Sequence, residues 1–482
     1  MRLHITRACL GALALGLAGC AHVPPDVAPL AQRDIGTSAL PADIRLAREG
    51  WPEAQWWKNY RDPQLDQLIG GALAASPTLE VAAARIGTAQ SALSRTRADA
   101  GIEIGAGAGA NRQRYSANGL LPAPIGGAYY NEETLRVEAR YNFDWWGRNK
   151  AQIAAAAGET NARRAEYAQA EQHLAAAIAH SYFTLQGGWA RRAALLELIA
   201  TQQALVQDKI KRAANGLNSG DAQRLAALDL ADLKRQLARL DGDNLREREA
   251  LRALTVSISG DALAGLAPRP LPGGPHALPA RLGIELLARR PDLQAARWRV
   301  EASISRIDAA RAAFYPDFNL SAAAGLDSIS LGRLLQAGSR TLFIGPTLSL
   351  PLFDSARLDA QIDATRSARN VQVAEYNQAV LQAVADVAQD GATLQAMENQ
   401  LAEQEKATAS AQSLLRSAQA RMERGLAERG AVLGARLALL RQQDTVLQLR
   451  QMQVQAEVAL IHSLGGGYRA EAPLLTSHQD RP

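Results

Sequence analysis

Cysteine and histidine are scarce in this chain of 482 residues. The two cysteines, Cys9 and Cys20, both lie near the N-terminus, and the seven histidines are scattered. These numbers exclude a disulfide scaffold and a metal site built from cysteines. Nucleophilic or metal-assisted catalysis has few residues to use. We therefore expect no metal, no cofactor and no enzymatic activity.

The chain also lacks a strong excess of one charge and a high apolar content. Lys plus Arg is 53 and Asp plus Glu is 48, which gives a net charge of +5 without a basic run. That balance argues against a nucleic-acid-binding protein. The mean hydropathy of −0.16 is too low for a bundle of membrane helices. The length allows two or three domains or one large repeated unit.

The first twenty residues have the pattern of an export signal. Arg2 and Arg7 form a positive region, and the apolar stretch 8–18 that follows is too short to span a bilayer. The sequence LAGC at 17–20 resembles the lipobox of bacterial lipoproteins. This resemblance implies that Cys20 becomes the first mature residue and carries acyl chains such as palmitate, and it favours the outer membrane. An ordinary signal peptide with an incidental cysteine is the alternative.

The sequence repeats itself. NFDWWGRNKAQI, which begins at Asn142, matches LFDSARLDAQI, which begins at Leu352. The same offset of 209 residues pairs Arg148 with Arg357, and farther along it pairs Arg212 with Arg421 and Gly216 with Gly425. Matches over so many positions predict an internal duplication.

Each half reads as a helix, two strands and a long helical hairpin. The strand regions are recognised by alternation: apolar side chains at odd positions of 135–143 are separated by polar ones. The expected elements are helices near 62–100 and 280–313, strands at 102–110, 135–143, 318–324 and 342–352, and loops at 112–131 and 327–340.

The helical hairpins account for most of the mass. The expected outgoing arms are 147–214 and 355–424; roughly 69 residues would give a rod of about 100 Å. Gly216 and Gly220 mark the first turn and Gly425 marks the second, after which the return arms reach about 256 and 464. The pair Gly187-Gly188 is expected to interrupt the first rod, because glycine weakens helices.

Strands with one apolar and one polar face, in an exported protein, suit an outer-membrane barrel. Four strands cannot close a barrel, because the smallest such barrels need about eight. Several copies must therefore share one barrel, with eight, twelve or sixteen strands for two, three or four copies. The alternative is that the strands belong to a soluble sheet packed on the helices.

Several motifs together resemble the TolC-like outer-membrane efflux proteins, specifically the NodT-like lipoprotein branch that works with resistance-nodulation-division pumps. The matching segments are the lipobox at Cys20, WWKNYRDPQLDQLIGGAL from Trp56, LLARRPDLQAARWRV from Leu286, AFYPDFNLSAAAGL from Ala313, FDSARLDAQI from Phe353 and the terminal ALIHSLGGGY. The resemblance covers nearly all of the mature chain. It implies a mostly α-helical trimer with a twelve-stranded β-barrel, four strands per chain, continued by a twelve-helix periplasmic tunnel.

The same resemblance implies a passive channel for small molecules. Its expected partners are two further copies of the chain, a periplasmic adaptor (membrane fusion) protein, an inner-membrane resistance-nodulation-division transporter and the lipid of the outer membrane. The alternative function is a lipid-anchored coiled-coil scaffold of the periplasm without channel activity.

Proteins of this family close the tunnel with aspartates and an arginine near the second hairpin turn. Here Gly434, Ala431 and Leu437 stand at those positions, so the family's gate cannot be carried over. The charged residues that could replace it near the two turns are Asp221, Arg224, Arg424, Glu428, Arg429 and Arg436. The alternative for each is a solvated position on a helix face.

The expected organisation follows from the repeat and the signal. It comprises a signal peptide at 1–19, a lipidated linker at 20–55, a first repeat at 56–260, a linker at 261–279, a second repeat at 280–467 and a C-terminal tail at 468–482.

Overall fold

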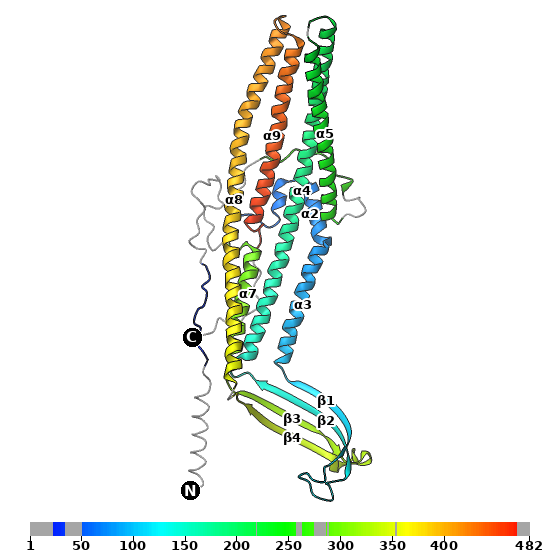
Figure 1. The fold of residues 1–482 in the computed structure, drawn as a ribbon, viewed down its shortest axis with the longest axis vertical. Coiled ribbons are helices and arrows are strands. Elements are labelled where there is room, and N and C mark those ends of the chain that lie inside the picture. The colour runs from blue at the N-terminus through cyan, green and yellow to red at the C-terminus, as the bar shows by residue number, and fades with distance from the viewer. Residues whose placement is uncertain are drawn as a thin grey trace.

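The fold was analysed in a computed structural model, which describes residues 23–33, 51–217, 219–256, 263–273, 286, 289–351 and 354–469. The described chain is a long rod of helices with a curved sheet at one end (Figure 1). Cys20, the signal peptide and most of the C-terminal tail lie outside these residues.

Two helices run unbroken along the rod. Helix α4 spans Arg148–Ala214 and has 67 residues, and helix α8 spans Ser355–Glu423 and has 69. Each is about 100 Å long at 1.5 Å per residue. The return arms α5 (Gly220–Leu254) and α9 (Arg429–Ser463) have 35 residues each. All four end within a few residues of the positions that the sequence predicts.

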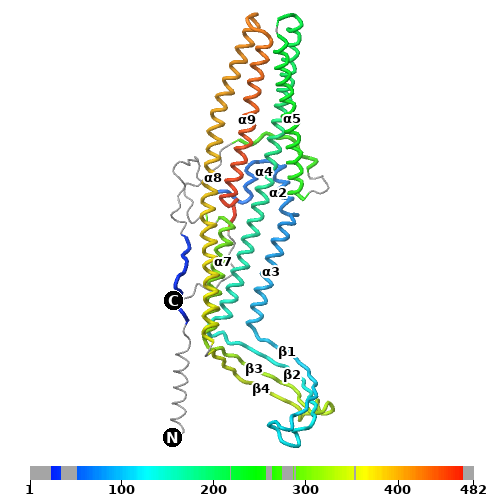
Figure 2. The backbone as a smooth tube through the Cα atoms, in the orientation of Figure 1, coloured from blue at the N-terminus to red at the C-terminus, as the bar shows by residue number. Residues whose placement is uncertain are grey.

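The shorter helices are stacked end to end beside the long ones. Between α4 and α8, helix α9 occupies the half of the rod farther from the sheet and α7 (Pro291–Ala312) occupies the half nearer to it (Figures 1 and 2). On the other side of α4, α5 is followed by α2 (Pro63–Ala75) and α3 (Pro77–Asp99). Each half of the rod is therefore four helices wide.

The predicted single helix at 62–100 is wrong, because the chain forms two helices there. Ser76 has an extended backbone (φ −72°, ψ 121°) and Pro77 begins α3. Proline has no N–H to donate and disfavours a helical residue before it, so it starts a new helix well and continues an old one badly. The predicted N-cap is present: the Asp62 carboxylate accepts from Gln64 N at 2.9 Å.

The predicted interruption of the first rod at Gly187-Gly188 is also wrong. Helix α4 continues through both residues. A Cβ atom added at Gly187 would collide with the side chain of Gln451, and one at Gly188 with the side chain of Asn244. The two glycines thus let α9 and α5 approach α4 closely, and this packing offsets their low helix propensity.

The four strands form one antiparallel sheet in the order β1-β2-β3-β4. The strands span Glu103–Arg114, Tyr129–Phe143, Asp317–Ser328 and Arg340–Ser349. The register places Ile104 opposite Ala139, Ala139 opposite Ala322, and Ala322 opposite Ile344. Each strand contains most of its predicted counterpart. Strands β1 and β2 continue beyond their predicted ends on the side away from the helices.

Two large apolar clusters hold the middle of the rod together. One joins the 3-10 helix η1 (Trp56–Tyr60) and α2 to α4, with Trp56, Tyr182 and Phe183 almost fully buried. The other joins α7, α8 and the end of α9. Within the described residues, no helix is both long enough and apolar enough to cross a membrane.

Candidate functional site

The two faces of the sheet differ in polarity. Because directly opposite residues of an antiparallel sheet point to the same side, the register assigns each side chain to a face. One face carries Ile104, Ala106, Ala108, Ala110, Leu135, Val137, Ala139, Tyr141, Phe143, Phe318, Leu320, Ala322, Ala324, Leu326, Leu342, Ile344, Pro346 and Leu348. Many of the larger side chains are exposed, among them Leu342 at 83% and Ile344 at 69%, whereas those of β3 are half-buried. Within the part of the chain that the structure describes, no element packs over this apolar face.

The opposite face is polar. Arg136, Glu138 and Arg140 alternate along β2, and the Glu138 carboxylate lies 3.6 Å and 3.7 Å from the two guanidinium groups. Nearer the helices, the Asn142 amide donates to Asp317 at 2.7 Å and to Asn319 at 2.9 Å. The large apolar exception is Phe343, opposite Ala323. A water-filled space could therefore be lined by this face.

Two tryptophans lie where the sheet meets the helices. Trp146 stacks on Tyr315 at 4.6 Å and donates from Nε1 to Pro316 O at 2.8 Å, so it packs the junction. Trp145 lies 4.1 Å from Phe318, at the edge of the apolar face, and is 62% exposed. An exposed indole at the end of an apolar band is the arrangement of an interfacial aromatic belt.

The two hairpin turns at the opposite end of the rod, here called the distal tip, have the same geometry. Gly216 and Gly425 both adopt φ +72°. After each, the next residue donates back to a helix carbonyl at 2.8 Å, Leu217 to Arg212 and Leu426 to Arg421. A left-handed residue at the helix end with this bond is a glycine C-cap. Gly220, predicted as part of the turn, is the first residue of α5.

Two of the predicted tip residues link the hairpins. Glu428 accepts from Arg212 of α4 at 2.7 Å, and Arg436 donates to Glu197 of α4 at 2.8 Å. A third α4–α9 ion pair, between Arg191 and Asp444, measures 3.1 Å.

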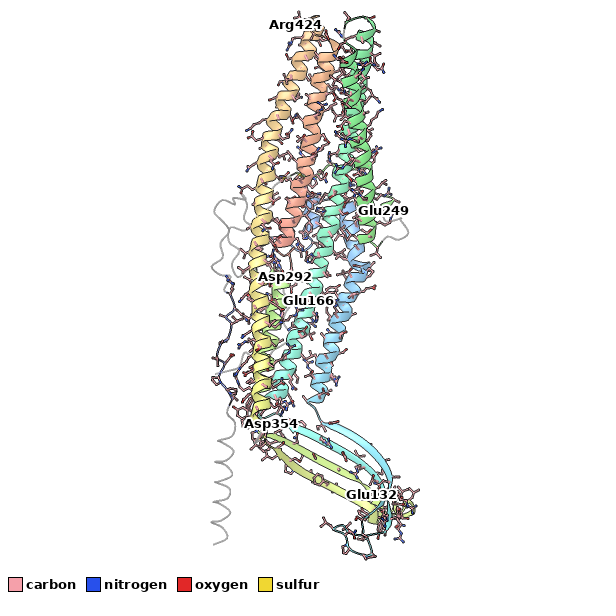
Figure 3. The ribbon with its side chains drawn as sticks, in the orientation of Figure 1. Glu132, Glu166, Glu249, Asp292, Asp354 and Arg424 are labelled. Atoms are coloured by element: carbon pink, nitrogen blue, oxygen red, sulfur yellow. The ribbon has the colours of Figure 1, made fainter. Side chains whose placement is uncertain are left out.

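The other predicted tip residues do not connect the hairpins. Asp221 and Arg224 pair with each other at 2.9 Å within α5, and both are largely exposed. Arg424 caps α8 at the distal tip and Arg429 begins α9 (Figure 3). Neither forms an ion pair with the described part of the chain.

A buried polar cluster marks the level where α9 ends and α7 begins. The guanidinium of Arg290 lies 2.7 Å from Asp292, 3.4 Å from Asp386 of α8 and 3.2 Å from Ser463 O of α9. Arg290 is nearly buried and ties three helices together. Its guanidinium donates to the Ser463 carbonyl at the end of α9, where a cation is favourable because the last helix carbonyls carry partial negative charge.

Next to this cluster, the rings of His462 and His173 lie 4.4 Å apart. Burial lowers the pKa of the His462 imidazole to about 4, and the nearby His173 and Arg290 act in the same direction. Burial instead raises the pKa of the Asp390 carboxyl, although that group accepts a hydrogen bond from Ser463. Among the described residues, no group of three or more His, Cys, Asp or Glu side chains could hold a metal ion.

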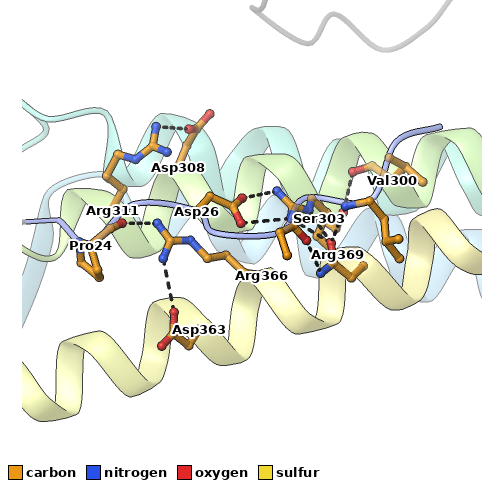
Figure 4. A network of polar contacts seen from close by, with 12 residues as sticks. Pro24, Asp26, Val300, Ser303, Asp308, Arg311, Asp363, Arg366 and Arg369 are labelled. Atoms are coloured by element: carbon orange, nitrogen blue, oxygen red, sulfur yellow. Dashed lines mark hydrogen bonds and ion pairs between the residues drawn. The ribbon is translucent and has the colours of Figure 1, made fainter.

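Residues 23–33, here called the strap, run along α8 without helix or strand (Figure 4). At the sheet end, Val23 packs against the cluster of Phe314, Leu358 and Ile362. Next, Arg366 donates to Pro24 O, and Arg369 forms an ion pair with Asp26 at 2.5 Å. That ion pair holds the pKa of the Asp26 carboxyl below its usual value.

Two asparagines one heptad apart bind the rest of the strap. The Asn370 amide donates to Ala28 O at 3.3 Å and accepts from Leu30 N at 3.2 Å. The Asn377 amide donates to Ala31 O at 3.0 Å and accepts from Arg33 N at 2.7 Å. Each asparagine amide thus forms the two hydrogen bonds with the strap that a peptide group of a neighbouring β-strand would form. The sequence predicts only a linker here, because these contacts join residues 340 or more positions apart.

The chain matches the family model described as "Outer membrane efflux protein" over residues 68–256 and again over 282–466. It is 39% identical over 466 residues to the multidrug resistance outer membrane protein MdtP of Escherichia coli K12, covering 94% of both chains. It is 33% identical over 470 residues to the multidrug resistance outer membrane protein MdtQ of Escherichia coli O157:H7, covering 95% of this chain and 97% of MdtQ.

Two solved structures have the same fold. The outer membrane protein VceC of Vibrio cholerae aligns with a TM-score of 0.76 at 32% identity, over 86% of this chain and 100% of VceC. The outer-membrane channel OprN aligns with a TM-score of 0.81 at 24% identity, over 93% of this chain and 99% of OprN.

Proposed function

The chain belongs to the outer membrane efflux protein family, and from this membership we propose that it is the outer-membrane channel of a tripartite efflux system. It would conduct drugs or other toxic small molecules passively from a resistance-nodulation-division pump and a periplasmic adaptor to the exterior. The names of the relatives MdtP and MdtQ, which carry the words multidrug resistance, support this substrate class. As a member of a transport family, the protein is not expected to catalyse a reaction.

The observation that carries the proposal is the sheet with two faces of opposite polarity at the end of a helical rod. Its apolar face suits lipid and its polar face suits a water-filled lumen. Strands β1 and β4 form the two edges of the described sheet, and a lipid-embedded sheet needs its edges paired. Three copies, joined edge to edge, would close a twelve-stranded barrel; the number three comes from the family.

The helices would continue the barrel as a tunnel. The outer helices of the rod are α8 on one side and α5 with α3 on the other, so these would meet between neighbouring copies in a ring (Figure 1). The exposed leucines Leu225 and Leu228 of α5 and Leu414 of α8 support this contact, since a neighbouring helix would cover them.

The strap supports the proposed lipid anchor at Cys20. Val23 packs beside the sheet end of α8, and Cys20 precedes it by three residues, which span at most about 11 Å. Acyl chains on Cys20 would therefore enter the membrane close to the barrel rim. The apolar face and this anchor would lie in the same bilayer.

We assign the gate to the distal tip. The ion pairs Arg212–Glu428 and Glu197–Arg436 would keep the second hairpin against the first and hold the tip closed. Their partial exposure makes each pair weak, about 0.2–1 kcal/mol, so an adaptor could separate them at low cost. The remaining predicted tip residues would form contacts outside the single chain; these are Asp221, Arg224, Arg424 and Arg429.

The repeated order of elements supports the proposed duplication. Helix α3, strands β1 and β2, and helices α4 and α5 are followed by α7, β3, β4, α8 and α9 in the same succession. We propose that 56–260 and 280–467 are the two copies, joined by 261–279 and preceded by the anchored linker.

Conductance of the purified protein tests the function. We expect a detergent-extracted, heat-resistant oligomer that opens ion-conducting pores in a planar bilayer. We also expect a deletion strain to become sensitive to several unrelated toxic compounds, with complementation by the intact gene. A monomer without conductance would favour the alternative, a lipid-anchored scaffold of the periplasm.

A further inference from the structure

The apolar face of the sheet ends differently at its two borders. At the border near the helices it ends in aromatic residues, with Phe143, Trp145 and Phe318 in contact. At the far border it ends in arginines. Arg112 and Arg114 of β1 and Arg340 of β4 all belong to the same face as the apolar side chains, because they continue its alternation.

The register establishes the position of these arginines. Arg112 lies opposite Asn131 and Arg114 opposite Tyr129, two and four residues beyond Ala110 on the same side of β1. From Phe143 to Leu135 the apolar face extends about 26 Å along β2 at roughly 3.3 Å per residue. Nine residues are about the length that a tilted strand needs to cross the hydrocarbon layer, and the arginines come directly after this stretch.

The ring of Tyr129 gathers two of these guanidinium groups. Arg112 lies 5.4 Å and Arg114 5.9 Å from the ring centroid, both within cation–π distance. Two cations on one ring repel each other, and an anion between them would relieve that repulsion. The three arginines are exposed and have no ion pair with any carboxylate of the described chain.

Only one carboxylate among the described strand residues shares this end of the face. Glu133 lies opposite Ala110 and Ser328, and it forms no ion pair with the three arginines. The border therefore keeps a net positive charge. By contrast, the arginines of the polar face have a carboxylate partner, since Glu138 lies between Arg136 and Arg140.

We infer that Arg112, Arg114 and Tyr129 bind a phosphate group of a phosphorylated glycolipid in the outer leaflet of the outer membrane, with Arg340 adding a third positive charge at the other edge of the sheet. This inference rests on the proposed function, since it requires the apolar face to contact lipid. Guanidinium groups bind phosphate through paired N–H donors, and basic groups just outside a hydrocarbon layer attract anionic headgroups. The acyl chains of the same lipid would cover the apolar side chains below.

Binding of lipid A to the purified oligomer in mild detergent, counted by native mass spectrometry, tests the site. We expect wild-type protein to bind lipid A with two phosphates roughly tenfold more tightly than dephosphorylated lipid A. The Arg112→Ala/Arg114→Ala variant should lose that preference, and Arg112→Lys/Arg114→Lys should keep part of it. The matched control is Arg136→Ala/Arg140→Ala, which removes the same charge from the polar face and should bind like wild type.

Several outcomes would overturn the inference. These are equal binding of the two lipids by wild-type protein, equal loss in the control variant, and binding of inorganic phosphate as tight as that of the lipid. The comparison of lipids needs no variant, so a misfolded variant does not prevent the test. Conductance separates the two proposals. A wild-type protein that conducts ions but does not prefer phosphorylated lipid A would refute the lipid site and still support the channel function.

Discussion

Helix α4 packs differently in the two halves of the rod. In the half near the sheet it approaches α7 closely, with Gly158 against Ala302 and the backbone at Trp298, beside the more buried ion pair Glu166–Arg299. In the half near the distal tip it meets α9 through an apolar cluster that includes Leu198 and Leu437 and through well-exposed ion pairs such as Glu197–Arg436. The buried positions of α8 thin out in the same direction, with only Ala411 buried beyond Met397.

The difference separates a fixed region from an adjustable one. Close-packed small residues leave no room for a helix to shift without steric overlap. Partly exposed ion pairs contribute little each and weaken with salt, so they can exchange partners. A channel that must stay sealed in the membrane and open at its tip needs both kinds of contact. Four predictions test this contrast.

The largest effect is expected at the joint between the halves. Arg290→Leu should destabilise the protein by about 3 kcal/mol, because it leaves Asp386 and the carbonyl at the end of α9 without their cation. Thermal unfolding in detergent measures the loss. Arg297→Leu, an exposed arginine of the same helix, is the control and should change little. Equal stability of the two variants would contradict the proposed role of Arg290 in holding the three helices together.

Acid should weaken the same joint. The pKa of His462 is about 4 in the folded protein, and its ordinary value of 6.5 applies to the unfolded chain. As the pH falls, the unfolded chain therefore takes up a proton before the folded protein does. Stability present above pH 6.5 is therefore lost between pH 6.5 and 4, by up to about 3 kcal/mol at 1.36 kcal/mol per pKa unit. His462→Asn should flatten this dependence, whereas His180→Asn at an exposed site of α4 should not. An unchanged profile in His462→Asn would contradict the assignment.

Replacing a glycine by a larger residue should change the stability differently in the two halves of the rod. At Gly158 a Cβ would lie 3.1 Å from the Ala302 Cβ and 3.2 Å from Trp298 O, so Gly158→Leu should cost about 1–3 kcal/mol. At Gly434, in α9 near the tip, a Cβ would meet nothing within 4 Å. Gly434→Leu should leave stability unchanged or raise it by under about 1 kcal/mol. Thermal unfolding of both variants measures the difference. Equal changes in stability for the two variants would contradict the prediction.

The smallest effect on stability is expected at the tip ion pairs. A double-mutant cycle of Glu197→Gln and Arg436→Gln should give a coupling of about 0.2–1 kcal/mol that falls with salt. Conductance should respond more strongly, with a larger closed-state leak in either single variant. The pair Asp221→Asn and Arg224→Gln, confined to α5, serves as the comparison. A leak that is the same in all four variants would argue against gating by the α4–α9 pairs.

Much of the fold could be predicted because its signals are local. The long arms lack proline, and glycine marks each tip turn, so helix ends were placed within a few residues. The strands follow from alternation within ten or so positions. The break at Ser76-Pro77 is harder to predict although proline signals it, because buried apolar positions keep a helical spacing on both sides of the break.

The candidate sites were predicted only in part, because their contacts join distant residues. Glu428 and Arg436 were proposed from their place near a turn, but their partners Arg212 and Glu197 lie in the other half of the chain. Asn370 and Asn377 look like ordinary polar positions of a helix until the strap lies beside them. No local pattern distinguishes such residues from solvated ones.

The strap also has a consequence for the order of folding. Asp26 and Arg369 are 343 positions apart, so their contact closes a very large loop whose entropic cost must be met by a preformed α8. We therefore expect the segment to dock after the long helices have formed. A newly exported polypeptide would reach its membrane with the Asn370 and Asn377 amides still facing water.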